Sequence, residues 1–304
     1  MLRFRFFQNL FLLALAFTST LRGVGGEADQ FLERELLGTD PFEEFQGDGE
    51  QLKGLWGHSG TSPIRIKTHV EVDPTVTPTY RFVADADFQI GSDSQLVRKE
   101  GHIEQMISMD PQPDFLITPG DLTHHARTCS YWFLYQDELG DFIKTIVDPL
   151  EAAGMDVFVC AGNHDEKSGM IDWIKKREGG ERYTFLYAGL RFICCGLYPD
   201  KDTVEWLQTI STDRPVVAFW HYNVSGPFSA DPGALGGQWW SEEERDAVFD
   251  VLLSRFDTRA VIVGHWHHSK LYEYRGIPVA VVGGRKFCVV DIDSSNNLSF
   301  SFQQ

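Results

Sequence analysis

One short stretch of the sequence limits the possible folds more than any other. Residues 156–161, Asp-Val-Phe-Val-Cys-Ala, form a mostly apolar run that predicts a buried strand. The run ends abruptly at Gly162, and Asn163, His164 and Asp165 follow, with side chains that can bind metal ions or exchange protons. Open α/β sheets bind their ligands at the carboxyl ends of strands. The stretch is therefore typical of an active-site loop that follows a strand.

From Tyr80 onward, the chain alternates between strand-like and helix-like segments. We expect strands at 80–84, 114–118, 156–161, 183–187, 191–195, 215–220, 260–263, 270–274, 279–282, 287–292 and 298–302. The expected helices lie at 94–109, 131–153 (interrupted near Gly140), 170–177, from about Asp202, and at 241–255. Ser241 and Glu244 have capping-box spacing, which marks the start of the last helix. Alternation followed by a run of strands predicts two sheets packed together with helices outside.

Metal-competent side chains follow five of the expected strands. They are Asp85 and Asp87, then Asp121, then Asn163 and His164, then His221, and finally His265 and His267. Strand ends of one sheet share an edge, so we expect these residues to converge on one rim. Carboxylate and imidazole ligands suit Mn, Fe or Zn better than Ca, which prefers oxygen alone. The set is too large for one tetrahedral ion, which favours two adjacent metals.

This order of residues resembles the calcineurin-like metallophosphoesterase superfamily, whose pattern is D-x-H, G-D, G-N-H-D/E, H and G-H-x-H. The resemblance runs from about Tyr80 to the last strand. It implies an α/β fold, a four-layer α/β/β/α sandwich of two mixed sheets flanked by helices. Carried over by position, it implies Asp85, Asp87 and His267 as ligands of the first metal, Asn163, His221 and His265 as ligands of the second, and Asp121 as a bridge between them. His164 would be catalytic, stabilising or protonating the leaving oxygen.

The function that this resemblance implies is dinuclear-metal hydrolysis of a phosphoester. A metal-bridging hydroxide would attack phosphorus in line with the leaving oxygen, without a covalent intermediate. We expect two divalent or trivalent ions from among Mn, Fe, Zn and Mg, and a small-molecule phosphoester substrate. The sequence leaves phosphatase and phosphodiesterase activity both open. The alternative is a non-catalytic metal-binding scaffold with the same fold, against which the retention of His164, His265 and His267 argues.

Two positions depart from the family pattern. The first motif reads Asp85-Ala86-Asp87, with aspartate where the family usually has histidine. Asp87 either makes the first metal site richer in oxygen, which favours Mn or Mg, or faces solvent. His124, three positions after Asp121, either supplies the missing imidazole to the first metal or lies outside the ligand shell.

The connections around these motifs are short. Only 56 positions (165–220) separate His164 from His221, which leaves no room for a large cap domain. Substrate choice is therefore expected to depend on the loops at 127–132, 166–177 and 222–240.

The N-terminus predicts a secretory signal. Arg3 and Arg5 precede an apolar run at 10–17 and small residues at 23–26, so we expect a signal peptide at 1–26 that is too short to anchor in a bilayer. The expectation is a secreted or lumenal protein with an arm or linker at 27–78 and a metallophosphoesterase domain at 79–304. The net charge of -17 argues against sequence-independent binding to nucleic acid or anionic membrane.

Two further features concern covalent chemistry. The five cysteines are an odd number without a CxxC pair, so the sequence allows one disulfide but assigns none. Asn223 and Asn297 fit the N-glycosylation pattern, and Asn297 is the better candidate because Asn223 lies so close to the expected site. The oligomeric state is not predicted.

Overall fold

A computed structural model describes residues 80–92, 99, 101–128, 137–226, 228 and 238–304. The predicted signal peptide at 1–26 and the arm at 27–78 lie outside the described residues. Cys129 and parts of the helix expected at 94–109 and of the loops at 127–132 and 222–240 also lie outside them. What we expect of these segments stays a prediction.

The first sheet contains five strands in the order β11-β10-β1-β2-β3. They are β1 (Tyr80–Ala84), β2 (Phe115–Thr118), β3 (Asp156–Val159), β10 (Phe287–Ile292) and β11 (Leu298–Gln303). β1, β2 and β3 are parallel, whereas β10 runs antiparallel to both β1 and β11. The three parallel strands are largely apolar because both of their faces are covered. Their carboxyl ends share one edge of the sheet.

The second sheet contains six strands in the order β4-β5-β6-β7-β9-β8. They are β4 (Tyr183–Tyr187), β5 (Leu190–Cys194), β6 (Val216–Trp220), β7 (Thr258–Val263), β8 (Lys270–Tyr274) and β9 (Ile277–Val281). β5, β6, β7 and β9 are parallel, while β4 and β8 are antiparallel edge strands. The predicted hairpin turning at Gly189 is confirmed as the β4–β5 pair.

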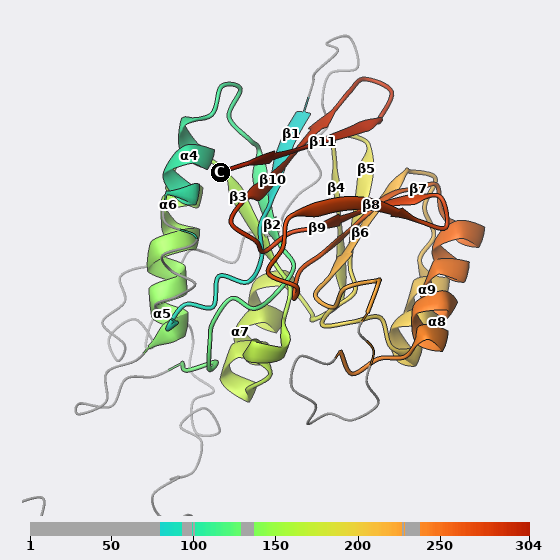
Figure 1. Ribbon diagram of the computed structural model, residues 1–304, viewed down its shortest axis with the longest axis horizontal. Coiled ribbons are helices and arrows are strands. Elements are labelled where there is room, and N and C mark those ends of the chain that lie inside the picture. Colours follow the sequence, from blue (N-terminus) through green and yellow to red (C-terminus); the bar gives the residue numbers. More distant parts are fainter. Residues whose placement is uncertain (1–79, 93–98, 100, 129–136, 227, 229–237) are drawn as a thin grey trace, which may run out of the picture. The chain divides into compact units, whose positions relative to one another are not determined.

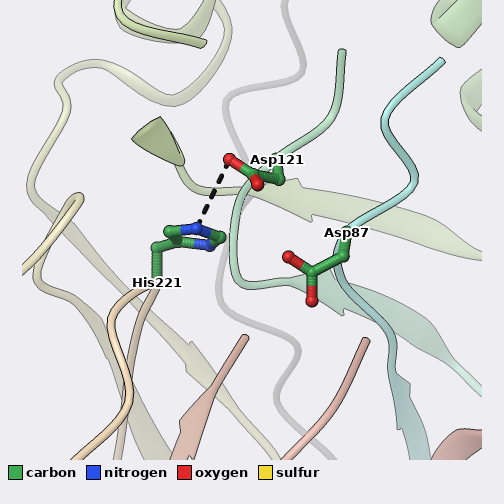
Figure 2. Close-up of side chains that lie close together, drawn as sticks. All are labelled: Asp87, Asp121 and His221. Carbon is green, nitrogen blue, oxygen red and sulfur yellow. Dashed lines mark ion pairs between the residues drawn. The ribbon is translucent and has the colours of Figure 1, made fainter. Parts of the chain in front are cut away.

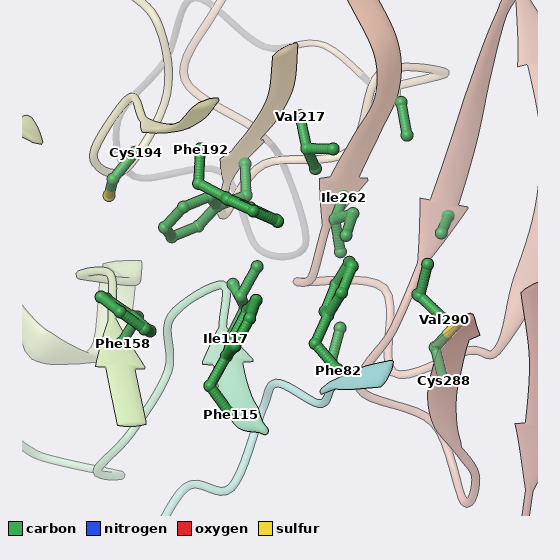
Figure 3. Close-up of a cluster of buried hydrophobic side chains, with 14 of the residues drawn as sticks. Phe82, Phe115, Ile117, Phe158, Phe192, Cys194, Val217, Ile262, Cys288 and Val290 are labelled. Atoms are coloured by element: carbon green, nitrogen blue, oxygen red, sulfur yellow. The ribbon is translucent and has the colours of Figure 1, made fainter. Parts of the chain in front are cut away.

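A continuous apolar layer joins the two sheets (Figure 3). Phe82 and Phe115 of the first sheet stack with ring centroids 5.1 Å apart, and Phe192 of the second sheet meets Phe82 edge-on. Val83, between two inward residues, packs on the opposite side of its sheet. Each buried ring stabilises the fold by about 1.5–3 kcal/mol relative to an exposed one. Period-two alternation along the strands thus places one face of each sheet in this shared core.

Helices cover the outer face of each sheet (Figure 1). They are α4 (His102–Ser108), α5 (Glu138–Phe142), the π-helical turn η2 (Ile143–Val147), α6 (Asp148–Ala152), the 3-10 turn η3 (Asn163–Asp165), α7 (Ser168–Glu178), α8 (Lys201–Thr209) and α9 (Glu242–Arg255). Met106, Leu150 and Met170 pack α4, α6 and α7 onto the first sheet. Leu207 and Phe249 pack α8 and α9 onto the second. The predicted α/β/β/α sandwich of two mixed sheets is confirmed.

The helix boundaries differ from the predictions in two places. The capping box of α9 is present, since the Glu244 N–H donates to Ser241 Oγ at 3.2 Å and the Ser241 N–H donates to Glu244 Oε2 at 2.7 Å. The cap of α8 is Asp200 rather than Asp202, because its carboxylate accepts the Thr203 N–H at 2.8 Å. The expected break near Gly140 is also wrong. Helix α5 runs through Gly140, and the irregularity comes later, at η2.

Three other sequence features can be followed in the described part of the chain. Cys160, Cys194, Cys195 and Cys288 are free, buried thiols there. Asn223 is fully buried and its Oδ1 accepts a hydrogen bond from the Tyr272 hydroxyl at 3.0 Å, whereas Asn297 is exposed. Over these same residues, no helix has both the length and the apolar character needed to cross a membrane.

Candidate metal centre

Loops from both sheets meet at one edge of the sandwich. The loop after β1 runs beside the loop after β2, where the Asp87 N–H donates to the Gly120 carbonyl at 3.1 Å. In the second sheet the Gly264 N–H, after β7, donates to the His221 carbonyl, after β6, at 2.9 Å. The two sets meet where the His265 N–H donates to Asp87 Oδ1 at 3.1 Å. Backbone bonds therefore hold the polar residues of both sheets in one place.

Asp87, Asp121 and His221 form the centre of this group (Figure 2). Each offers one ligand atom, and these atoms all lie within 4.8 Å of one another. All three residues are buried. The predicted alternative in which Asp87 faces solvent does not occur. Two carboxylates and an imidazole at this spacing are the donors that a first-row divalent ion prefers.

The protonation of His221 shows that this cluster is short of positive charge. Its Nδ1–H donates to the Pro119 carbonyl at 2.8 Å, because a carbonyl oxygen can only accept. Burial lowers the pKa of His221, although the Asp121 charge acts in the opposite direction. The neutral ring thus presents an Nε2 lone pair to Asp121 Oδ1 at 3.3 Å and to Asn163 Oδ1 at 3.0 Å. Three lone-pair atoms face one another, and a cation between them satisfies all three.

Two other predicted ligands lie against this cluster. His265 Nδ1 is 3.0 Å from Asn163 Oδ1 and 3.3 Å from His221 Nε2. Burial, followed by the nearby His221, lowers the pKa of His265 to about 3, so this ring is also neutral and offers an electron pair to a metal ion.

Asp87 has one free oxygen in this cluster. Its Oδ2 is buried and has no hydrogen-bond partner among the residues that the structure describes. Burial and then the Asp121 charge raise the pKa of Asp87 well above its usual range.

Gln89 is a site residue that the sequence analysis missed. Its Nε2 donates to Asp121 Oδ2 at 3.0 Å and lies 3.4 Å from His267 Nε2. His267 Nε2 is in turn 3.7 Å from Asp87 Oδ1. Rotation of the Gln89 amide by 180° would exchange Nε2 for Oε1, so that an oxygen would lie between Asp121 and His267. The spacing of Asp87-Phe88-Gln89 could have pointed to Gln89. It has one residue between two polar groups, as the D-x-H pattern does, but begins two positions after Asp85, where we placed that pattern.

Asp85, the other predicted ligand of the first metal, has different partners. It is fully buried, its Oδ1 forms an ion pair with Lys99 Nζ, and its Oδ2 lies 2.8 Å from His102 Nδ1. Burial acts to raise the pKa of Asp85, but Lys99 and then His102 outweigh it, so the pKa falls below its usual value. Protein donors therefore occupy both oxygens of Asp85. No local sequence pattern pointed to Lys99, which lies 14 residues away.

His164 and His124 form a pair beside the centre. The His164 N–H donates to Asp121 Oδ1 at 2.9 Å, and its Nδ1–H donates to the His124 carbonyl at 2.7 Å. The His164 Nε2 is 4.0 Å from Asp121 Oδ2, and the side chain is 32% exposed, so it can reach a bound molecule. The His124 ring stacks on His164, with centroids 5.1 Å apart. His124 thus orients His164.

The backbone is strained at the centre. Five non-glycine residues there have φ between 42° and 71°: Asp87, Gln89, Asp121, His265 and His267. The left-handed region costs about 1–2 kcal/mol for a residue with a Cβ atom. Such strain collects at functional sites because the surrounding structure holds it in place. The same loops therefore carry the candidate ligands and the strain.

Asp165 joins two of the loops. Its carboxylate accepts the N–H groups of Gly162, Leu122 and Thr123 at 2.9–3.0 Å, and the Thr123 hydroxyl at 2.9 Å. Burial and the Asp121 charge raise the pKa of Asp165 to about 7, while these backbone donors act to lower it. The side chain thus fixes the loop after β3 to the loop after β2.

We expect Asp165→Asn to lower the free energy of unfolding by about 2 kcal/mol. The amide is the same size, but its NH₂ group must face at least one backbone N–H that the carboxylate accepted. Urea unfolding measures the effect, with the exposed Asp172→Asn on α7 as the control. Equal unfolding midpoints for the two variants would contradict the role of Asp165 in joining the loops.

A fold of two facing sheets whose strand-end loops carry carboxylates and imidazoles defines a class of metal-dependent hydrolases. Residues 80–269 match the family model of the calcineurin-like phosphoesterases. The chain belongs to this family. Its members are hydrolases that act on phosphoesters and bind divalent metals, in agreement with the ligand cluster described above.

Two relatives extend the comparison. A probable cyclic nucleotide phosphodiesterase of Rhodococcus erythropolis (strain PR4 / NBRC 100887) is 27% identical over 194 residues, which cover 58% of this chain and 58% of that protein. The crystal structure of a dimetal phosphatase from Danio rerio is similar in fold, with a TM-score of 0.52 and 16% identity over 75% of this chain and 100% of that one. The match to the phosphodiesterase thus spans little more than half of its length.

Proposed function

We propose that the protein hydrolyses phosphoesters at a centre of two metal ions. The observation that carries this is the convergence of lone pairs from His221, Asp121 and Asn163, which leaves a buried place for a cation. The proposed ligands of one ion are Asp87, Gln89, His267 and Asp121. Those of the other are Asn163, His221, His265 and Asp121. Gln89 thus takes the ligand position that we expected for Asp85, whose oxygens already have protein partners.

When bound, two such ions lower the pKa of a shared water and neutralise the phosphoryl charge. The chain supplies the remaining groups. Asp121 faces both ligand sets and accepts the N–H of His164, so its position fixes that of the neighbouring histidine. The His124 carbonyl holds the Nδ1 proton of His164, so the doubly protonated ring would donate its Nε2 proton to the leaving oxygen and keep the proton on Nδ1. Asp165 keeps the two loops that carry these residues together.

We infer that the substrate is a phosphodiester. The relative described as a probable cyclic nucleotide phosphodiesterase supports this choice, although the match covers 58% of its length. The predicted signal peptide at 1–26 supports a secreted or lumenal location.

Metal analysis combined with an activity assay tests the proposal. The purified chain is loaded with Mn, Fe or Zn, its metal content is measured, and hydrolysis of bis-p-nitrophenyl phosphate is compared with that of p-nitrophenyl phosphate. We expect two ions per chain, faster cleavage of the diester, and loss of activity on chelation. A full metal complement without turnover of either ester would instead indicate the metal-binding scaffold.

We expect His164→Ala to slow hydrolysis according to the leaving group. Loss of a proton donor lowers kcat by about 10²–10⁴-fold when the departing alkoxide is basic. The effect on p-nitrophenyl esters is expected to be far smaller, because p-nitrophenolate leaves without a proton. The measurement compares kcat for alkyl and p-nitrophenyl diesters at equal metal content, with the exposed His268→Ala as the control. A uniform loss for both esters would contradict the role of His164 as acid.

A further inference from the structure

The loop between β9 and β10 packs against the candidate metal centre and carries two cationic residues. It spans residues 282–286 and contains Gly283, Gly284, Arg285 and Lys286. Gly283 has φ +105° and packs so closely on Asp87 that a Cβ atom would overlap the carboxylate. Arg285 follows two residues later, within about 7 Å of Gly283 along the chain. The main chain of this loop is therefore held close to Asp87 by a contact that only glycine allows.

Main-chain hydrogen bonds hold this loop on both sides. His102 Nε2 lies 3.1 Å from the Arg285 carbonyl, and His102 is itself bound to the buried Asp85. The Ser269 hydroxyl donates to the Lys286 carbonyl at 2.8 Å, and Ser269 follows the proposed ligand His267 by two residues. Because both anchors use carbonyl oxygens, the side chains of Arg285 and Lys286 take no part in holding the loop.

These two side chains are exposed and make no ion pair or hydrogen bond with any residue that the structure describes. Several other arginines there are paired, as Arg259 is with Asp257 at 2.6 Å and Arg275 is with Asp250 at 2.6 Å. The chain has a net charge of -17, so partners for two more cations are abundant. Two cations without a partner among the described residues, on an anchored loop beside the candidate metal centre, are thus available to a bound anion.

We propose that Arg285 and Lys286 form a second anion site, which binds a phosphate of the substrate other than the one that is cleaved. The inference rests on the proposed phosphoesterase function and adds the substrate class, a phosphodiester that carries a further phosphate group. A guanidinium presents paired N–H donors that match two phosphate oxygens, and an ammonium beside it adds a point charge. The metal centre holds the scissile group, and the loop holds the second one.

The test uses two chromogenic diesters that differ only by one phosphate. They are thymidine 5′-(p-nitrophenyl phosphate) and the same compound with a 3′-phosphate, and both report cleavage by release of p-nitrophenol. We expect the native chain to have a KM about tenfold lower for the 3′-phosphorylated ester. The double variant Arg285→Gln/Lys286→Gln is expected to lose this preference, while its kcat and KM for the singly charged ester stay unchanged.

Lys144→Gln/Lys176→Gln is the matched control, since it removes the same charge from exposed residues of η2 and α7. It is expected to keep the preference, and Arg285→Glu/Lys286→Glu is expected to reverse it. The proposal would be overturned if the native chain showed no preference for the 3′-phosphorylated ester at low salt. It would also be overturned if Arg285→Gln/Lys286→Gln kept that preference.

A binding measurement separates this inference from the proposed function. Calorimetry compares thymidine 3′,5′-bisphosphate with thymidine 5′-monophosphate on the metal-loaded chain. If neither ester is cleaved but the bisphosphate binds about tenfold more tightly and Arg285→Gln/Lys286→Gln abolishes the difference, the anion site stands and the phosphoesterase proposal fails. Equal affinities for the two nucleotides would overturn the anion site, whatever the activity.

Discussion

Replacing Asp121 by asparagine is expected to reduce kcat by about a thousandfold or more and to lower the metal content of the purified chain. Burial acts to raise the pKa of Asp121, but hydrogen bonds from the His164 N–H and from Gln89 act in the opposite direction and the pKa lies below its usual value, so the group is ionised in the folded protein. Asparagine keeps the size of the side chain and removes its charge. One oxygen is also lost as an acceptor, either for the His164 N–H or for Gln89 Nε2.

The measurement is metal content per chain together with kcat on bis-p-nitrophenyl phosphate. Asp250→Asn provides the control, because Asp250 lies on α9 and pairs with the surface residue Arg275. It is expected to behave as the native chain. If Asp121→Asn retained two metal ions and native kcat, Asp121 would not be a shared ligand, and the proposed centre would have to be abandoned.

Replacing Lys99 by methionine is expected to lower the free energy of unfolding by about 3–5 kcal/mol. Lys99 and Asp85 are 3% and 0% exposed in their side chains, so the substitution leaves a buried carboxylate with His102 as its remaining charged partner. The folded state lowers the pKa of Asp85, so this stability is present above the unfolded pKa. It is lost as the pH falls through the lower, folded value.

Urea unfolding of Lys99→Met, Asp85→Asn and the double variant forms a complete cycle. The double variant is expected to be more stable than Lys99→Met alone, because asparagine removes the charge that would otherwise be buried without its main partner. A loss of less than 1 kcal/mol in Lys99→Met would show that the ion pair does not hold Asp85. Strict additivity in the cycle would lead to the same conclusion.

The later motifs of the site could be predicted from the sequence because their geometry is local. Gly162-Asn163-His164 begins three residues after the end of the short strand β3, and His221 follows β6 directly. A residue at the end of a parallel strand lies at the ligand-binding edge whatever the rest of the chain does. His265 follows β7 by the same rule. The two-sheet sandwich follows from the apolar runs and their order, which depend only on the periodicity of the strands.

The first motif could not be placed in this way. Asp85 follows β1 immediately, so the rule that we applied to β3 and β6 selects it as a ligand as well. The loop instead makes left-handed turns at Asp87 and Gln89, which bring these two residues to the centre. Asp85 is held elsewhere by Lys99 and His102, 14 and 17 residues away.

The sandwich and the candidate ligands that follow β2, β3, β6 and β7 could be predicted from local patterns, because apolar periodicity and strand ends act over a few residues. Which carboxylate after β1 faces this cluster depends on long-range contacts. A rule based on neighbouring residues cannot distinguish Asp85 from Asp87. The distant Lys99 distinguishes them, because it pairs with Asp85. Because Asp85 is buried beside a cation, it stays ionised away from the cluster, and Asp87 is the carboxylate that faces the candidate metal centre.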